Sequence, residues 1–529
     1  MDAKSYLDQK SHHTLHDLSK VSAVEQILNK MAPFTYPVVA AFVLFLCGVA
    51  AWLVYYRWKN RSFPPGPIGL PFLGYLPFLG GYLPEKFARL SATHGDVMTV
   101  QLGKKQAVVL GSLDALRAAF VDQATVFSGR GDVFLLRELW DGNGGILMSE
   151  GAKWNSLRSF TIANLKLNDA MDAIKAETME VISVLKTHLA AGDMPQDSRS
   201  FLMQVVANVG CHWTLGQRVP YVDQTFQAYL ANFRKVADLM HHCSSSALVP
   251  SLNPVSSKTP QMAKLEKEFQ DKIDYIRTLM LASLKHNKPN FAGDFLAKSK
   301  DKTDRESSLY TERELVMVLN DLWGASTEAG TSLLQWAVFY MIKYPTIQRT
   351  VQEELDRVIG APKGGIIVDA DKVQLPYTMA TLQEIERCAS VSPFGVLRCN
   401  TEATDLRGYT IPPRTLIIPN LWQIHHDKAN WEDPTTFQPE RFLDAKRNVT
   451  RPPYLVPFSI GTRACPFQNV AESMLFSFFA NLLHCFTLDT PAGQTLLTES
   501  DRISALTDRP KDFQFVVKAR YEQLLPGSN

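Results

Sequence analysis

The sequence predicts a mainly α-helical protein with small peripheral β-sheets, behind a single N-terminal transmembrane helix. Three observations lead to this prediction. Apolar residues recur at helical spacing in residues 161–190, 262–287 and 312–343. Strand patterns are short and paired, as in residues 99–111. An uncharged run from Met31 to Tyr56 is long enough to cross a membrane, which takes about 20 apolar residues.

The apolar run is predicted to be a membrane anchor rather than a cleaved signal peptide or a buried core helix. A signal peptide has an apolar core of about 7–15 residues, and here about thirty mostly polar residues come first. Arg57, Lys59 and Arg61 follow the run, with no acidic residue before Glu85. The positive-inside rule therefore predicts that this C-terminal flank lies in the cytoplasm.

A proline-rich hinge follows the anchor. The prolines between Phe63 and Pro67 cannot continue a helix, and they form a stiff, extended linker. The expected organisation is a lumenal tail over residues 1–30, an anchor over 31–56, a basic and proline-rich hinge over 57–67 and a cytoplasmic domain over 68–529.

Helices dominate the body of the chain. The helix expected over 312–343 carries Gly324 and Gly330, each of which weakens a helix by about 1 kcal/mol relative to alanine, and it ends before Pro345. The other elements expected here are two strands around Gly103 in 99–111, a strand, turn and strand in 405–418, and helices over 346–359 and 377–390.

The composition describes a large globular chain without a nucleic-acid signature. Of its 529 residues 46% are hydrophobic, so the chain can bury a sizeable core. Its 55 basic and 53 acidic residues nearly balance and leave a net charge of +2. That balance gives no electrostatic reason to expect nucleic acid as a partner.

The cysteines form neither a disulfide framework nor a zinc motif. Their number is odd, their spacing is scattered, and no CxxC occurs. Most are expected to be buried free thiols in a reducing compartment. They lie at positions 47, 211, 243, 388, 399, 465 and 485.

Cys465 differs from the other cysteines in its local context. Pro466 favours the first turn of a helix, so Cys465 is predicted to be the N-cap of a helix that runs from Pro466 towards Leu483. Free N–H groups and the helix dipole would stabilise a thiolate there. Gly461 permits a tight turn ahead of it. A metal-ligating cysteine and a buried free thiol both remain open on this basis.

Several separated motifs together resemble the cytochrome P-450 superfamily of haem-thiolate monooxygenases. The closest similarity is to the microsomal animal enzymes that oxidise drugs and steroids, and it covers residues 31 to about 520. The ExxR pair can share one helix face, because residues three apart are neighbours. The motifs are the cysteine loop with Phe458, Gly461, Arg463 and Cys465, the ExxR pair Glu384 and Arg387, the FxPERF segment with Arg441, the WxxxR pair Trp154 and Arg158, and Arg398.

The resemblance implies a fold, a cofactor and partners. The fold would be the triangular, mostly α P-450 prism, with haem b between the helix containing Gly324 and the helix starting at Pro466. Cys465 would be the axial ligand of the haem iron. Contacts to the haem are implied for Trp154, Arg158, Arg398, Phe458, Gly461 and Arg463, and a supporting ion-pair network for Glu384, Arg387 and Arg441.

The same resemblance implies the reaction and the location. One oxygen atom from O2 would enter an apolar substrate such as a steroid, a fatty acid or a xenobiotic. Electrons would come from NADPH through NADPH-cytochrome P-450 reductase. The protein would sit in the endoplasmic reticulum membrane in contact with its lipid. The expected substrate lining is residues 130–148, the helix near Trp323 to Ala325, and residues 391–397.

Two departures from the family pattern bear on mechanism. The family's distal helix usually has an acid followed by threonine, and here Glu328 is followed by Ala329. Thr327 is expected to help Glu328 through a water, whereas Thr331 lies about 200° around the helix from Ala329. The family also usually has glycine two residues after the cysteine, where this chain has Phe467.

These departures leave two alternative functions open. A haem-thiolate isomerase that rearranges a lipid peroxide needs no reductase and can dispense with the acid–alcohol pair. A membrane haem-binding protein with little turnover is the other alternative.

Overall fold

The structure is a computed structural model. It describes residues 39–524, apart from 57, 59, 60, 104, 132, 133, 193, 248–258, 286–288, 302, 304, 363, 364 and 505. The chain divides into two compact units, Met1–Phe63 and Pro64–Asn529. The expected lumenal tail, the first part of the expected anchor, and Arg57 and Lys59 of the hinge lie outside the described residues.

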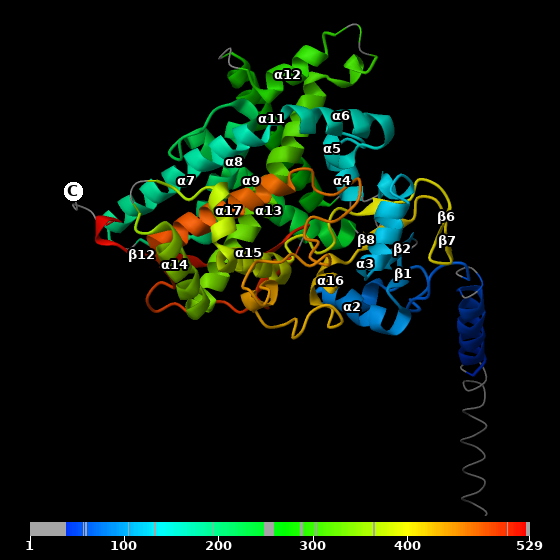
Figure 1. Ribbon diagram of the computed structural model, residues 1–529. Helices are drawn as coiled ribbons and strands as arrows, with labels where there is room; N and C mark the ends of the chain where they lie inside the picture. The colour runs from blue at the N-terminus through cyan, green and yellow to red at the C-terminus, as the bar shows by residue number, and fades with distance from the viewer. Residues whose placement is uncertain are drawn as a thin grey trace, which may run out of the picture. The chain divides into compact units, whose positions relative to one another are not determined.

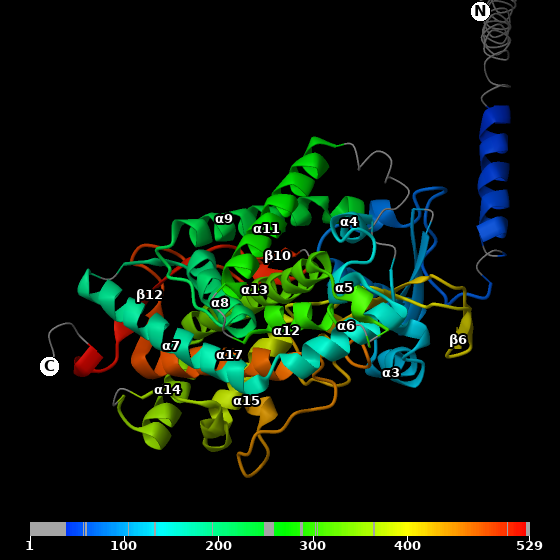
Figure 2. The ribbon, with the colours of Figure 1, turned by 90° about the horizontal axis from the view of Figure 1, so that it is seen from above.

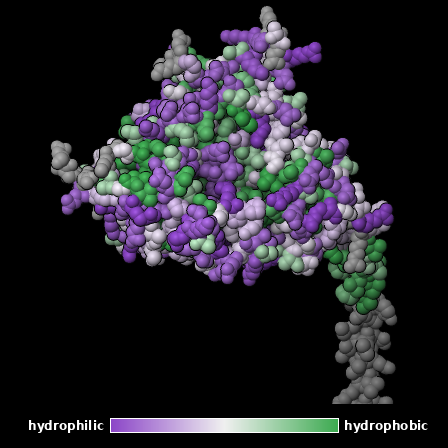
Figure 3. Space-filling model, in the orientation of Figure 1, coloured by the Kyte–Doolittle hydropathy of each residue, from purple (hydrophilic) through white to green (hydrophobic). Residues whose placement is uncertain are grey.

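Among its described residues, the first unit contains one helix, Val39–Tyr56, that is long and apolar enough to cross a membrane. Its mean hydropathy is 2.2, and its 18 residues rise about 27 Å at 1.5 Å each. None of its residues is buried within the protein, and Figure 3 shows its surface as strongly hydrophobic. The aromatic rings of Trp52 and Tyr56 pair near its C-terminal end, with centroids 5.3 Å apart. A membrane-spanning helix of this kind agrees with the predicted anchor.

The second unit is mainly helical, which confirms the predicted fold class. Its helices are α2 (Leu83–His94), α3 (Leu113–Arg117), α4 (Phe134–Leu139), α5 (Gly145–Met148), α6 (Gly151–Asn164), α7 (Leu167–Ala190), α8 (Ser198–Leu215), α9 (Gln224–Ala247), α11 (Pro260–Leu284), α12 (Phe291–Lys298), α13 (Glu312–Lys343), α14 (Pro345–Ile359), α15 (Pro376–Ala389), α16 (Leu421–His426) and α17 (Gln468–Cys485).

The long helix α13 has the bounds that the sequence predicts. Its N-cap is Thr311, whose Oγ1 accepts the Glu314 N–H at 3.1 Å, and it ends where Pro345 begins α14. Acidic residues lie in its first turn and Lys343 lies in its last, which complements the helix dipole. Helices α8, α11, α15 and α17 all pack against it, and Figures 1 and 2 show it running through the middle of the unit.

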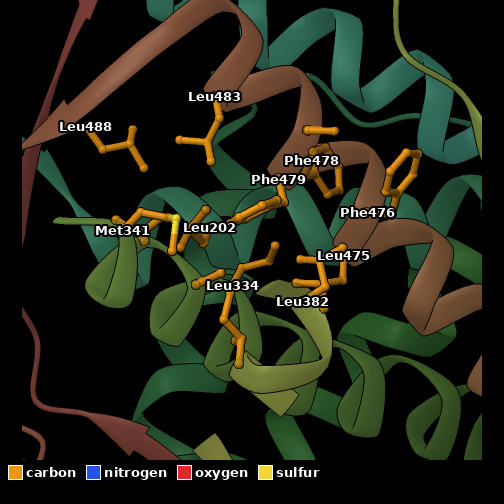
Figure 4. Close-up of a cluster of buried hydrophobic side chains, with 14 of the residues drawn as sticks. Leu202, Leu334, Met341, Leu382, Leu475, Phe476, Phe478, Phe479, Leu483 and Leu488 are labelled. Atoms are coloured by element: carbon orange, nitrogen blue, oxygen red, sulfur yellow. The ribbon is translucent and has the colours of Figure 1, made fainter. Parts of the chain in front are cut away.

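The largest hydrophobic cluster lies where α7, α8, α13, α15 and α17 meet. Figure 4 shows leucine, phenylalanine and methionine side chains from α8, α13, α15 and α17 gathered in this cluster. Phe476, Leu483 and Ala480 of α17 are fully buried there. Each buried leucine or phenylalanine side chain contributes about 1.5–3 kcal/mol, so this cluster holds α17 and α13 in place.

The β-structure is small, as predicted. A five-stranded sheet has the order β1-β2-β8-β5-β3, in which only β2 and β8 pair in parallel. Smaller antiparallel sheets pair β6 with β7, β10 with β11, and β12 with β4 and β9. The strands are β1 (Val97–Leu102), β2 (Lys105–Leu110), β3 (Gly129–Arg130), β4 (Gln196–Asp197), β5 (Arg398–Cys399), β6 (Thr404–Leu406), β7 (Tyr409–Ile411), β8 (Leu416–Pro419), β9 (Phe486–Asp489), β10 (Arg502–Ser504), β11 (Asp508–Pro510) and β12 (Gln514–Ala519).

Two segments differ from their predicted form. Residues 161–190 are not one helix, because α6 ends at Asn164 and α7 begins at Leu167. The carbonyl of Lys166 accepts the Trp213 Nε1–H at 3.0 Å, so a contact from α8 occupies the break. In residues 405–418, β6 and β7 form a hairpin while β8 leaves it to pair with β2 and β5. Both differences arise from long-range contacts that spacing within a segment cannot reveal.

Candidate active site

A tight turn presents Cys465 directly before α17. Gly461 has φ +79°, and a Cβ atom there would lie 1.9 Å from the Phe120 carbonyl oxygen, so a side chain cannot fit. The Cys465 N–H donates to the Phe458 carbonyl oxygen at 3.1 Å and closes the turn. Main-chain geometry therefore sets the position of Cys465, whose side chain is exposed.

The helix after Cys465 begins later than the sequence predicts. Phe467, not Cys465, is the N-cap of α17, and Gln468 is its first residue. The Phe467 carbonyl accepts the Ala471 N–H at 3.0 Å, as an N-cap carbonyl does. The Phe467 ring packs edge-on against Trp213 of α8, with ring centroids 4.9 Å apart. Contact with α8 thus accommodates the bulky side chain of Phe467. The same contact accompanies the late start of α17.

This shift places a backbone donor on the sulfur of Cys465. An N-cap N–H has no partner within its own helix, and the Phe467 N–H donates to the Cys465 sulfur. The surrounding protein raises the pKa of the Cys465 thiol, while this N–H and the Arg158 guanidinium act to lower it. A coordinated metal ion deprotonates a thiol outright, so Cys465 is suited to be a ligand.

Four arginines from separate elements gather beside the cysteine turn. Arg158 of α6 donates to the Ala464 carbonyl at 2.8 Å. Arg398 of β5 donates to the Ile460 carbonyl at 3.0 Å. The Arg463 guanidinium lies 3.9 Å from the centroid of the Trp154 ring and donates to the Ser149 carbonyl at 2.7 Å. Trp154 and Arg158 of α6, together with Arg398 and Arg463, are therefore brought together as the sequence predicts.

The fourth arginine, Arg130 of β3, was expected only as part of the substrate lining. Its Nε donates to the Leu147 carbonyl at 2.7 Å, and its charge repels Arg463, Arg398 and Arg158. The sequence offers no local signal for this role, because Arg130 belongs to no motif of the family pattern.

The arginine cluster carries an excess of buried positive charge. Burial, together with repulsion from neighbouring guanidiniums, lowers the pKa of Arg463 to about 8 and that of Arg398 to about 9. Glu150 is the acid that acts on Arg463, and it already binds Arg414 at 2.9 Å. The buried Nη1 of Arg398 has no hydrogen-bond partner among the described residues. A cofactor with two carboxylates, such as the propionates of haem, fits this charge and this free donor.

The ExxR pair forms a buried ion-pair network. Arg387 binds Glu384 through two hydrogen bonds, of 2.7 and 2.8 Å, and both side chains are fully buried. Arg441, in the short 3-10 helix η7 (Pro439–Phe442), adds a bond of 3.2 Å to Glu384. Arg387 also donates to the carbonyls of His425 and Pro434. This network ties α15 to the segment that leads towards the cysteine turn.

On α13, Glu328 faces a different partner from the one the family pattern suggests. Its Oε1 accepts the hydroxyl of Thr507 at 3.1 Å, from the link between β10 and β11. A Cβ atom on Gly324 would have no other atom within 4 Å, and Ala325 is exposed in the middle of the helix. Gly324 and Ala325 therefore face open space. Thr507 is far away in the sequence, so no local signal marks it.

Thr327 lies on another side of α13. Its side chain is fully buried, and its hydroxyl has no hydrogen-bond partner among the described residues. The α13 residues that flank it along the helix, Trp323 and Gly330, pack against α8. Successive residues are about 100° apart on a helix, so the structure does not bring Thr327 to the side of Glu328 and Thr507. Trp323 likewise points to α8, where its Nε1 donates to Thr214 at 2.9 Å, and away from the expected substrate lining.

Asp321 fixes the segment that covers this side of α13. Its carboxylate accepts the Trp140 Nε1–H at 2.5 Å and the N–H groups of Ile146 and Leu147 at 2.6 and 2.7 Å. Burial raises the pKa of Asp321 to about 7. In the sequence, the only sign of this role is that Asp321 is a charged residue inside an apolar helical stretch. Residues 140–148, part of the expected substrate lining, are thus held on α13 by Asp321 and by Glu314, which accepts the Gly145 N–H at 2.6 Å.

Known proteins are similar in sequence to most of this chain. The family model for cytochrome P450 matches residues 64–517. Cytochrome P450 2B2 of Rattus norvegicus is 30% identical over 497 residues, which covers 92% of this chain and all of the relative. Cytochrome P450 2B12 of Rattus norvegicus is 33% identical, covering 81% of this chain and 88% of the relative. Cytochrome P450 2U1 of Homo sapiens is 29% identical, covering 90% and 93%.

Proposed function

The chain belongs to the cytochrome P450 family of haem-dependent monooxygenases, and we propose that Cys465 is the ligand of its haem iron. The observation that carries this proposal is the pairing of the Cys465 turn with the arginine cluster. A bound haem supplies oxygen activation, and a thiolate ligand favours O–O cleavage. The chain itself supplies a sulfur held by main-chain geometry and buried cations for the two propionates.

We assign the haem contacts to residues around the turn. Arg158, Arg398 and Arg463 supply charge to the propionates, and Arg130 joins them. Trp154 lies against Arg463 and fixes the plane of its guanidinium. Phe458 and Gly461 shape the turn. Glu384, Arg387 and Arg441 hold the scaffold behind it and do not touch the reacting atoms.

We assign proton delivery to Glu328, oriented by Thr507. Their hydrogen bond places a hydroxyl next to the acid, although position 329 is alanine. The Thr507 hydroxyl orients the carboxyl group of Glu328, which would relay protons on the open side of α13. Thr327 would have to act through water from the α8 side, so we give it no direct part.

The open side of α13 supports an apolar, small-molecule substrate. Gly324 and Ala325 leave space there, and Trp140 and Phe269 pack nearby with ring centroids 5.2 Å apart. Such surfaces bind apolar ligands and exclude water from the reaction.

We further propose that the protein is anchored in the endoplasmic reticulum membrane by Val39–Tyr56, with the enzyme in the cytoplasm. The basic residues that follow the helix support this orientation through the positive-inside rule. The electron donor would be NADPH-cytochrome P450 reductase in the same membrane. The family assignment favours oxygen insertion over peroxide rearrangement and over haem binding without turnover.

One experiment tests the function as a whole. The full-length protein, reconstituted with reductase and lipid, should form hydroxylated product from apolar substrates only when NADPH is present. Turnover of a lipid hydroperoxide without NADPH or reductase, and none with them, would overturn the monooxygenase assignment. A normal reduced CO spectrum with no turnover in either assay would also overturn it.

A further inference from the structure

A lysine is buried on the side of α11 that faces α13. Lys272 is only 5% exposed, although lysine is almost never fully buried without a partner. Among the described residues, none hydrogen-bonds to its ammonium group and no carboxylate pairs with it. Its Nζ lies 4.4 Å from the ring centroid of Phe269 and 5.6 Å from that of Phe233. Two aromatic rings, from α9 and α11, therefore lie beside the ammonium group.

Two acidic side chains attract the ammonium group of Lys272, but both already accept hydrogen bonds from other residues. Asp321 and Glu328 both act electrostatically on Lys272 across the space between α11 and α13. Asp321 accepts hydrogen bonds from Trp140, Ile146 and Leu147. Glu328 accepts one from Thr507. These acids lie two turns apart on α13, on the same side of the helix as Gly324, where a Cβ atom would have no other atom within 4 Å.

An ammonium group in such a place favours a negatively charged ligand. Burial lowers the pKa of Lys272 to about 8, so the group is still mostly charged at neutral pH. An unpaired buried charge is costly, and an anion that binds it recovers that cost. One ammonium beside two carboxylates suits a ligand with a single charge, because a dianion would be repelled by Asp321 and Glu328.

We propose that Lys272 is the binding site for the carboxylate of an amphipathic substrate, whose apolar chain extends along the open side of α13. This inference deepens the proposed function and rests on it. Cation–π contacts from Phe269 and Phe233 hold the ammonium in place without neutralising it. A substrate held by its carboxylate on α11 presents its chain to the oxidising centre. Oxidation is therefore expected on the chain, away from the carboxylate.

The test compares a carboxylic acid with its uncharged ester. Binding of dodecanoate and of methyl dodecanoate is measured by calorimetry and by the absorption shift of the haem, with the full-length, haem-loaded protein in phosphatidylcholine nanodiscs. The wild type should bind the acid more tightly than the ester by about 10- to 100-fold, the strength of hydrogen bonds to charged groups. Lys272→Met should lose that preference while changing ester affinity by less than about 3-fold.

Two further variants serve as controls. Lys267→Met removes an exposed lysine from the same helix, and it should keep the acid preference. Lys272→Arg keeps the charge, and it should keep at least part of the preference. Comparing the acid-to-ester ratio between variants cancels the different partition of the two ligands into lipid, because this partition is the same for every variant.

Two outcomes overturn the inference alone. One is a wild type with a normal reduced CO spectrum and no acid preference. The other is a Lys272→Met variant that weakens acid and ester equally, which would show that the lysine only supports packing. A protein without the red-shifted CO band overturns the proposed function, and this inference with it.

Discussion

The turn around Cys465 and the open side of α13 are built in different ways. Main-chain contacts hold the turn, including the Cys465 N–H bond to Phe458 and the close approach of Gly461 to Phe120. Side chains from distant segments shape the open side of α13, where Thr507 reaches Glu328 and Lys272 approaches from α11.

The difference explains how each region tolerates change. Near Cys465, the ring of Phe467 packs against α8, and the turn keeps its geometry. On α13, where position 329 is alanine, the hydroxyl beside Glu328 comes from Thr507 in another part of the chain. Substitutions near the turn should therefore act on haem binding or stability, and those near α13 on specificity and coupling.

The largest effect is expected from Cys465→Ala. Removing the sulfur leaves the haem iron without its thiolate, so the red-shifted band of the reduced, CO-bound protein should vanish. Cys485→Ala, at the other end of α17, should keep the band and serves as the control. A Cys465→Ala protein that retains the band would disprove the assignment of the ligand.

Arg387→Ala should destabilise the fold most among the ion-pair variants. The change leaves Glu384 buried without its bidentate partner, which costs about 3–5 kcal/mol. Denaturant unfolding measures this loss. Arg89→Ala breaks an exposed pair with Glu85 and should cost under about 1 kcal/mol. Equal losses in the two variants would show that the buried network has no special role.

Binding of a carboxylate substrate should weaken as pH rises. Lys272 is protonated below its pKa of about 8 and neutral above it, so the affinity should fall by about 10-fold between pH 7 and 9. The groups that face it are Asp321 and Glu328 on α13 and the rings of Phe233 and Phe269. As the pH rises, Asp321, whose pKa is about 7, becomes negatively charged. It then repels the substrate carboxylate and also weakens binding.

The arginine variant separates the two titrations. Lys272→Arg stays charged through this range, so any remaining pH dependence measures the contribution of the acids. A wild type whose acid affinity stays flat from pH 7 to 9 would contradict the assignment to Lys272.

Thr507→Val should lower the product formed per NADPH consumed. The loss of one hydrogen bond to Glu328 should lower this yield by about 2- to 10-fold. Adding Ala329→Thr to this variant should restore much of the yield, because a hydroxyl returns beside the acid. An unchanged yield in Thr507→Val would remove Thr507 from the proton path.

The smallest effect is expected from Phe467→Gly. The variant loses the edge-on contact with Trp213, worth about 0.5–1.5 kcal/mol beyond burial, but keeps the CO band. A double-mutant cycle with Trp213→Leu should give a coupling energy of this size. A coupling near zero, or loss of the band, would mean that Phe467 acts on the haem directly.

The sequence by itself determined the features that short-range spacing controls. The bounds of α13, the ExxR pair and the turn before Cys465 follow from helix periodicity, from residues three apart on one face, and from a glycine that alone fits the turn. The membrane-spanning length of the N-terminal helix is of the same kind.

Only the tertiary structure decided the features that depend on distant partners. The break between α6 and α7 and the late start of α17 both involve Trp213 of α8. Thr327 turns towards α8, while Thr507 supplies the hydroxyl at Glu328. Lys272 is a candidate binding residue only because the fold places its ammonium group beside aromatic rings from two helices. The physical reason is that burial and hydrogen bonding are satisfied between segments, and a pattern within one segment does not contain its partners.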